Sequence, residues 1–477
     1  MLHIPKWEVR IGTHPLLSKD YEVKINGEDC EVRECRVSAM PYNRVFTGYQ
    51  RPKNQTELAS YITFSADEAA TFEIKAKKQF TNAYIKPYSK NVKVDVNDGI
   101  IRFTLTQFGQ YVLELDDEHL ALHIFYNEAK AYPEKENATY YFGPGLHFPK
   151  RIELKDNDLI YVDEDAIVYA SIEGRNAKNV RIFGGGVLDG GAEDRVVEHC
   201  YEPYTTGTIR LYNCENISIE DVVLKDSATW VLSMFDCDTI NIDGIKIVGH
   251  WRYNTDGIDV CNTSNVTIKN SFVRAFDDVI TIKGLYNYQK PIENIVIDNC
   301  VLWCGWGRNA EIGVETSAIE YKNITFKNCD LVHSSHVVLS LHNGCEANIH
   351  DITYENINVE YNATEMFPVY HHIEEEPYPG VGKPFVPTFI YASNYDHFSL
   401  FDGETPSIGN IHDILYKNIH VTIPEGVEKP DVVFASREYG PTFQNFTIDG
   451  LYVNGEKQTN FDKFNLTVKN AENIMFK

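Results

Sequence analysis

A short phrase that returns along the second part of the chain constrains the fold most. It reads Asn, apolar, any residue, apolar, any residue, then Asn, Asp or Gly, and its copies begin at Asn179, Asn216, Thr239, Asn265, Asn294, Asn323, Asp351, Asp413 and Asn445. The middle copies are 23 to 29 residues apart, which is the period of a solenoid. Each unit contains short β-branched runs and has no room for a long helix. The predicted unit is therefore a β-coil, and stacked coils form parallel sheets.

The asparagine that opens most copies predicts a ladder of side chains that satisfies backbone groups of the turns, because Asn commonly bonds the backbone there. Cys300 and Cys329 hold the same place in two copies, so we expect them to stack as reduced thiols in neighbouring coils. The ten cysteines are too sparse for a disulfide scaffold, and no Cys or His group has zinc spacing. The sequence thus predicts no metal and no cofactor.

Residues 1–145 have a different texture, with alternating apolar and polar residues broken by Gly, Asn and Asp turns. This pattern predicts an all-β chain with a β-sandwich at 1–145 and a parallel β-helix at 146–477. An insertion at about 362–410, rich in aromatic residues and proline, adds roughly one extra coil to the period. Such insertions are usually surface loops on a binding face, although an ordinary covering loop is the alternative.

The formal charge of −25 repels polyanions, which argues against nucleic acid and anionic membranes as partners. No apolar run approaches the length of a membrane span, and the first residues contain no export signal. We therefore expect a cytoplasmic protein, or a secreted one if the N-terminus has been trimmed. The oligomeric state stays open.

Three aspartates are the candidate catalytic residues. Asp256 lies 21 residues before Asp277 and Asp278, a separation close to one short coil, so the three carboxylates should share one patch. Neighbouring carboxylates are costly unless their environments separate their pKa values. That arrangement suits glycoside cleavage, in which one acid protonates the departing oxygen and a base activates water. Calcium binding is an alternative that would need more oxygen ligands.

The phrase NTDGID, the following DD pair and the preceding GGGVLDGG resemble the polygalacturonase family, glycoside hydrolase family 28. The domain order also resembles the dextranase and isopullulanase family, glycoside hydrolase family 49. The resemblance implies a right-handed parallel β-helix and an inverting hydrolase that uses no metal. It further implies that Asp277 is the general acid and that Asp256 and Asp278 hold the attacking water.

Two departures from the polygalacturonase pattern affect the expected substrate. Trp306 stands where the family has the histidine of a Gly-His-Gly segment, and Ser340 and His342 stand where an Arg-Ile-Lys element grips a uronate. An aromatic in place of a cation suits a neutral sugar. We therefore expect a neutral poly- or oligosaccharide with α-linkages, such as an α-glucan or α-galactoside, bound by Asn254, Lys283, Trp306, Arg308, Glu311, Glu315 and His342. Trp303, Trp306 and His342 could instead be packing residues.

Other functions remain open at this point. A hydrolase of galacturonides is favoured only if Arg308 or Lys283 points at a sugar carboxylate, because a guanidinium can bind it bidentately. A non-catalytic glycan-binding β-helix and a lyase or epimerase are the further alternatives. The sequence supplies neither the sugar nor the linkage, and it does not distinguish endo from exo action.

Overall fold

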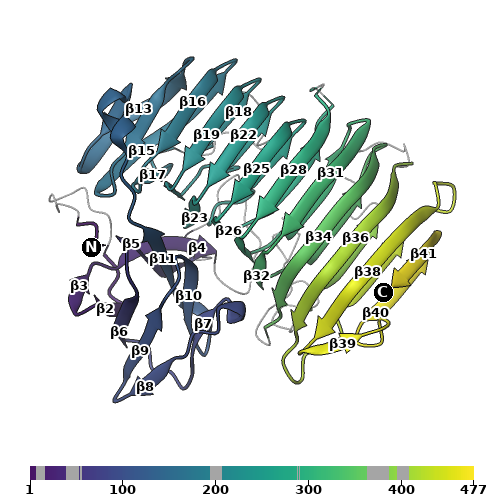
Figure 1. The fold of residues 1–477 in the computed structure, drawn as a ribbon, viewed down its shortest axis with the longest axis horizontal. Coiled ribbons are helices and arrows are strands. Elements are labelled where there is room, and N and C mark those ends of the chain that lie inside the picture. Colours follow the sequence, from purple (N-terminus) through teal and green to yellow (C-terminus); the bar gives the residue numbers. More distant parts are fainter. Residues whose placement is uncertain are drawn as a thin grey trace.

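The regular secondary structure of the protein is almost entirely β-strand in the computed structural model (Figure 1). The structure describes residues 1–6, 17–38, 53, 56–193, 207–286, 288, 290–362, 386–394 and 408–477. Two short 3₁₀ helices, η2 and η3, are the helical elements of these residues and span Tyr88–Lys90 and Pro133–Asn137. The expected all-β class is confirmed.

The N-terminal part is a sandwich of two sheets that share one core. The first sheet has the order β1 (Leu2–His3), β5 (Thr56–Ala66), β11 (Asp117–Glu128), β10 (Gly109–Leu115) and β7 (Ala83–Lys86), with β4 (Arg33–Ser38) beside β5. The second has the order β3 (Glu28–Cys30), β2 (Tyr21–Ile25), β6 (Ala70–Ala76), β9 (Ile100–Leu105) and β8 (Asp95–Asn97). Buried and exposed residues alternate along β2 and β6, as in strands with one face on a core.

The rest of the described chain is a right-handed parallel β-helix with three sheets. It begins with β12 (Tyr140–Phe142) and β13 (Gly145–Leu154), and the long β15 (Ala166–Arg175) joins the second and third sheets. The first sheet contains β14 (Leu159–Val162), β16 (Lys178–Phe183), β19 (Glu215–Glu220), β22 (Asp238–Asp243), β25 (Ser264–Lys269), β28 (Ile292–Asp298), β31 (Glu320–Lys327), β34 (Asn348–Glu360), β36 (Asn410–Thr422), β38 (Phe443–Val453) and β41 (Ala471–Phe476).

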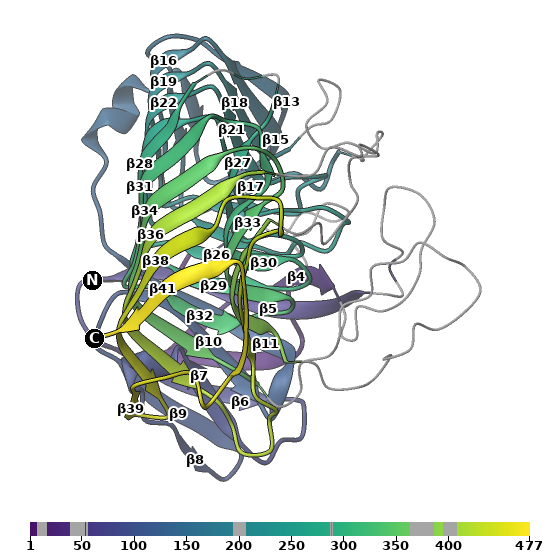
Figure 2. The ribbon, with the colours of Figure 1, turned by 90° about the vertical axis from the view of Figure 1, so that its right-hand side faces the viewer.

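The second sheet faces the sandwich and contains β17 (Val187–Asp189), β20 (Val223–Lys225), β23 (Lys246–Val248), β26 (Phe272–Ala275), β29 (Val301–Cys304), β32 (Asp330–His333) and the end of β34. The third contains β18 (Ile209–Tyr212), β21 (Leu232–Phe235), β24 (Ile258–Cys261), β27 (Ile280–Gly284), β30 (Arg308–Thr316), β33 (Val337–Asn343), β35 (Thr388–Ser393), β37 (Asp431–Ala435) and β40 (Asn465–Lys469). A short hairpin strand, β39 (Glu456–Gln458), pairs with β38. Figure 2 shows the stacked coils nearly end-on.

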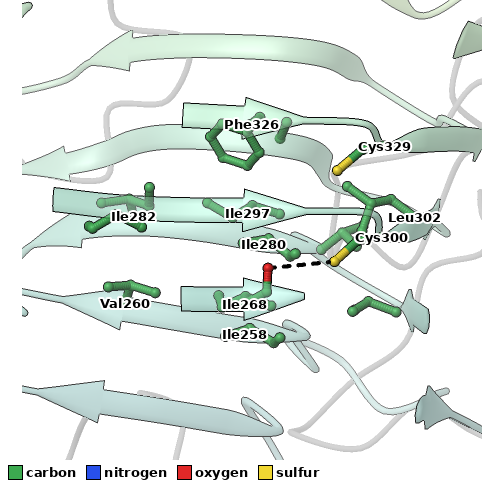
Figure 3. Packing of buried hydrophobic residues seen from close by; sticks show 14 of the residues in the cluster. Ile258, Val260, Ile268, Ile280, Ile282, Ile297, Cys300, Leu302, Phe326 and Cys329 are labelled. Atoms are coloured by element: carbon green, nitrogen blue, oxygen red, sulfur yellow. Dashed lines mark hydrogen bonds between the residues drawn. The ribbon is translucent and has the colours of Figure 1, made fainter. Parts of the chain in front are cut away.

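Equivalent residues of successive coils stack in the core of the β-helix. In the first sheet Ile240, Val266, Ile295 and Ile324 are paired in register and buried. The repeated apolar phrase therefore becomes continuous columns of side chains, which bury apolar surface at every coil. Cys300 and Cys329 are buried free thiols in adjacent coils, as expected; Cys300 Sγ donates to Ile268 O over 3.9 Å (Figure 3).

An asparagine ladder runs along the start of the first sheet. Asn265, Asn294 and Asn323 have φ of 57°, 58° and 54°, and the Nδ2 of each of the last two donates to the Oδ1 of the asparagine one coil earlier, over 3.1 Å and 3.4 Å. The predicted ladder is confirmed, but its hydrogen bonds join side chain to side chain. A second ladder, which the sequence analysis missed, follows the same sheet, where Asn299 donates to Asn270 over 2.8 Å.

Replacing Asn294 with alanine should lower the free energy of unfolding by about 2 kcal/mol, because a left-handed backbone and two ladder hydrogen bonds lose their support. Asn294→Gly should cost about half as much, since glycine tolerates positive φ and loses only the ladder. Urea unfolding of both variants checks this. An alanine variant as stable as the wild type would contradict the role of the ladder.

The sandwich lies firmly against the second sheet of the β-helix. Tyr61 and Phe125 pack on Val223 and Phe272 in one buried cluster. Charged residues also pair across this interface: Lys86 Nζ of β7 lies 3.3 Å from Glu360 Oε2 of β34, and His333 of β32 contacts Glu114 of β10. The buried charges have partners with defined geometry, which fixes the orientation of the two parts.

The strands described between Asp351 and Asp413 belong to one coil, so the excess length of this interval does not add a coil to the β-helix. β36 pairs directly with β34, with His412 opposite His350, and β35 supplies the third-sheet strand of this coil by pairing with β33 and β37. Most of the predicted insertion at 362–410 lies outside the described residues.

Candidate active site

The predicted catalytic aspartates lie on the turns that lead from the second sheet into the third. Asp256 comes just before β24, and Asp277 and Asp278 come just before β27 on the next coil. Backbone hydrogen bonds continue through these turns: Gly257 N–H donates to Asp278 O over 2.8 Å, and Asp277 N–H donates to Thr255 O over 3.3 Å. The coil period thus stacks Asp256 against the Asp277–Asp278 pair, as the spacing predicts.

Lys283 of β27 is the cation at the centre of this group. Its side chain is 4% exposed, and its Nζ donates to Asp256 Oδ2 over 3.0 Å. The same Nζ lies 3.4 Å from Asp259 Oδ1, 3.8 Å from Asp278 Oδ2 and 3.8 Å from Glu315 Oε2. Lys283 therefore has carboxylates on both neighbouring coils and on its own coil.

Arg308 continues the network onto the following coil. Its backbone N–H donates to Asp278 Oδ1 over 2.9 Å, and its Nη1 lies 3.8 Å from the same oxygen. Its Nε lies 3.7 Å from Glu311 Oε2, a carboxylate with no exposed surface. Charges of opposite sign therefore alternate from Asp256 through Lys283, Asp278 and Arg308 to Glu311.

The environments of the carboxylates differ. Burial raises the pKa of Asp256 to about 6, although the Lys283 ammonium opposes this shift. Burial, Asp256 and Asp278 together raise the pKa of Asp277 well above its usual range. Asp277 is half-buried, whereas Asp256 and Asp278 are only 1% and 6% exposed. The carboxyl group that favours its proton is thus also the most accessible of the three.

Gly307 packs directly against the Asp277–Asp278 pair. A Cβ at this position would lie 2.5 Å from Asp277 Oδ1 and 2.5 Å from both the backbone nitrogen and the Oδ1 of Asp278. Real Cβ atoms essentially never come this close to other heavy atoms. The site therefore requires glycine here. From the sequence alone, this residue is only the second glycine of the segment in which Trp306 replaces the family's histidine.

Trp306 and Trp303, which the sequence could not separate, have different surroundings. Trp306 lies on the turn before β30, is half-buried and stacks on Phe276 with ring centroids 5.3 Å apart. Trp303 is a packing residue at the sandwich interface, where its ring stacks on His333 at 4.0 Å and lies under Arg274. The turn thus carries one aromatic ring beside the aspartates.

The outer face of the third sheet carries a row of polar residues. Asp259, Thr281, Glu311, Ser340 and Tyr391 are paired in register from β24 to β35. Burial raises the pKa of Glu311 to about 7, against the lowering effect of Arg308. The residues that alternate with this row along each strand point into the core of the β-helix. The row therefore lies on the outer face of the third sheet, on the same side as the turns that carry the aspartates.

The structure brings most of the predicted residues into one network, and Asn254 joins it by donating to Asp256 Oδ1 over 3.3 Å. His342 lies two positions beyond Ser340 on β33 and meets the edge of Tyr391, with ring centroids 5.5 Å apart. Asp259 was missed, although it stands within the quoted NTDGID motif. Asp259 stands two residues after Gly257, which is the spacing of residues on one face of a strand, and this spacing is the signal that could have identified it.

Within the described part of the chain, no group of three or more His, Cys, Asp or Glu side chains could hold a metal ion. No helix among those residues is long and apolar enough to cross a membrane.

Residues 139–369 match the family model described as glycosyl hydrolases family 28. A probable rhamnogalacturonase B of Aspergillus terreus is 26% identical over 33% of this chain and 28% of its own length. Rhamnogalacturonase A of Emericella nidulans is 28% identical over 33% of this chain and 29% of its own length. The matched segment is thus less than a third of the length of these relatives.

Among solved structures, Dex49A from Penicillium minioluteum has a TM-score of 0.62 with 13% identity and covers 97% of this chain and 95% of its own. This likeness shows the fold and extends it to nearly the whole chain. The family match and the rhamnogalacturonase relatives support a glycoside hydrolase built on a right-handed parallel β-helix.

Proposed function

We propose that the protein is an inverting glycoside hydrolase in which Asp277 is the general acid and Asp256 and Asp278 hold the attacking water. One observation carries this assignment: Asp277 is the most accessible of the three carboxyl groups, burial and two neighbouring carboxylates raise its pKa well above the usual range, and Lys283 contacts the other two. Paired carboxyl groups with separated pKa values are the acid and base that glycoside cleavage requires.

The proton balance of the reaction follows from these roles. Asp277 gives its proton to the glycosidic oxygen while the bond from that oxygen to the anomeric carbon breaks. Water attacks the opposite face of the sugar and loses a proton to Asp256 or Asp278. The product has the inverted configuration, no covalent intermediate forms, and the water's proton restores the acid through solvent.

We propose that the sugar at the point of cleavage is neutral. Both cations of the network, Lys283 and Arg308, pair with protein carboxylates, which supports a site without a uronate clamp. The excess of carboxylates around them disfavours a negatively charged sugar by like-charge repulsion. Trp306 offers a ring face on which the apolar face of a neutral sugar can stack.

A galacturonate-containing polymer is the second candidate, because the relatives are rhamnogalacturonases. Their name denotes a polymer that contains rhamnose, a neutral sugar, as well as galacturonic acid. A neutral residue at the cleavage point and a uronate one position away would satisfy both observations.

A substrate panel tests this proposal. Purified protein is incubated with α-glucans, α-galactosides, polygalacturonate and rhamnogalacturonan, and the released sugars are identified by mass spectrometry. The neutral-sugar assignment expects a neutral sugar at the new reducing end. A galacturonate at that end would overturn the neutral-sugar assignment, and a neutral end released from rhamnogalacturonan alone would favour the second candidate. An unsaturated uronate would point to a lyase, and binding without cleavage would favour a glycan-binding module.

A further inference from the structure

The ammonium group of Lys283 is surrounded by four carboxylates of the protein itself. Its ammonium group contacts Asp256 from the turn before β24, Asp259 from β24, Asp278 from the turn before β27 and Glu315 from β30. Nζ also lies 4.3 Å from the centre of the Trp230 ring, two coils earlier. Carboxylates and a ring face surround it, and its side chain is 4% exposed.

We propose that Lys283 is a positioning residue that holds Asp256 and Asp278 in place and keeps Asp256 ionised, so that Asp277 is left as the acid of the group. This inference rests on the proposed hydrolytic function. It differs from the expectation drawn from the sequence, in which Lys283 helps to bind the sugar.

The distances favour this role over a sugar contact. Nζ donates to Asp256 Oδ2 over 3.0 Å, and the other oxygen of that carboxylate accepts from Asn254 over 3.3 Å. Asp278 accepts the Arg308 backbone N–H over 2.9 Å while it faces Lys283 at 3.8 Å. Both carboxylates are therefore held from two sides, which fixes the water between them and the sugar.

Electrostatics point the same way. Burial alone lowers the pKa of Lys283, but the surrounding carboxylates, led by Asp256, raise it well above its usual range. The lysine thus stays charged across the working pH, and its charge opposes the effect of burial on the pKa of Asp256. Burial and the flanking Asp256 and Asp278 raise the pKa of Asp277 more than Lys283 and Arg308 lower it, which favours the protonated form of Asp277.

Lys283→Met and Lys283→Gln test the proposal through the pH dependence of kcat/KM. Loss of the cation raises the pKa of Asp256, so the base keeps its proton to higher pH and the acid limb should move upward by about one pH unit or more. Lys283→Arg should keep the limb within a few tenths of a unit. Lys225→Met is the matched control, because Lys225 is a half-buried lysine paired with Asp189 outside this network.

A second readout requires no turnover. In potentiometric titration between pH 7 and 9, folded Lys283→Gln should release about half a proton to one proton more than wild type. Asp256 is mostly ionised at pH 7 in the wild type, whereas in the variant it keeps its proton to higher pH and loses it within this range. If the wild type hydrolyses no glycoside, the proposed function fails, and this titration still decides the role of Lys283. An unmoved acid limb, a rise in KM alone, or equal proton release in both proteins would overturn the proposal.

Discussion

Replacing Asp277 with asparagine is expected to lower kcat on the natural glycan by about 10²- to 10⁴-fold, the usual contribution of a positioned general acid. The amide retains the shape of the side chain but has no proton to give to the departing oxygen. Asp277 is only half-buried, so the variant should fold with a melting temperature close to that of the wild type. Initial rates and thermal unfolding, measured on the same preparation, check both statements.

The role of Asp277 as the acid, and not merely as a charge, is tested by the leaving group. An aryl glycoside with an acidic phenol needs little protonation, so Asp277→Asn should lose far less activity on it than on the glycan. Asp351→Asn is the matched control, because Asp351 occupies a ladder position where other coils carry asparagine. Equal losses on both kinds of substrate would remove Asp277 from the role of proton donor.

Gly307→Ala is expected to lower kcat/KM by about 10²-fold, since small displacements of catalytic groups have effects of this size. The new methyl group would meet Asp277 Oδ1, the backbone nitrogen of Asp278 and Asp278 Oδ1 at 2.5 Å, so the aspartates or the turn must shift. The shift would also disturb the hydrogen bond from Arg308 N–H to Asp278 Oδ1.

Gly143→Ala provides the comparison for this variant. A methyl group there would meet only the ring of Tyr141, whose side chain is 52% exposed and free to move. It should therefore leave kcat/KM within a factor of two. If Gly307→Ala keeps wild-type kcat/KM and the wild-type melting temperature, the close packing of this turn on the aspartates is not needed for catalysis.

The sequence predicted the β-helix because its repeat carries the information locally. A period of one coil and an apolar alternation within it require stacked strands, and the column of Ile240, Val266, Ile295 and Ile324 follows directly. The second asparagine ladder had a visible signal as well, since Asn270 and Asn299 each stand five residues after a member of the first.

The candidate site was predictable to the extent that it depends on the coil period. That period places Asp256 beside Asp277 and Asp278, but it says nothing of which way a turn residue points. Trp303 and Trp306 are three residues apart, yet one lies on a strand that faces the sandwich and the other on the turn beside the aspartates. The position of Lys283 among four carboxylates likewise depends on three-dimensional register.

The most direct test of inverting hydrolysis by the aspartate group is the anomeric configuration of the first product, followed by ¹H NMR from the start of the reaction with wild type and Asp277→Asn. We predict that wild type releases the anomer opposite to the substrate linkage before mutarotation and that the variant releases almost none on the same time scale. Release of the retained anomer, or an undiminished rate in the variant, would contradict the assigned mechanism.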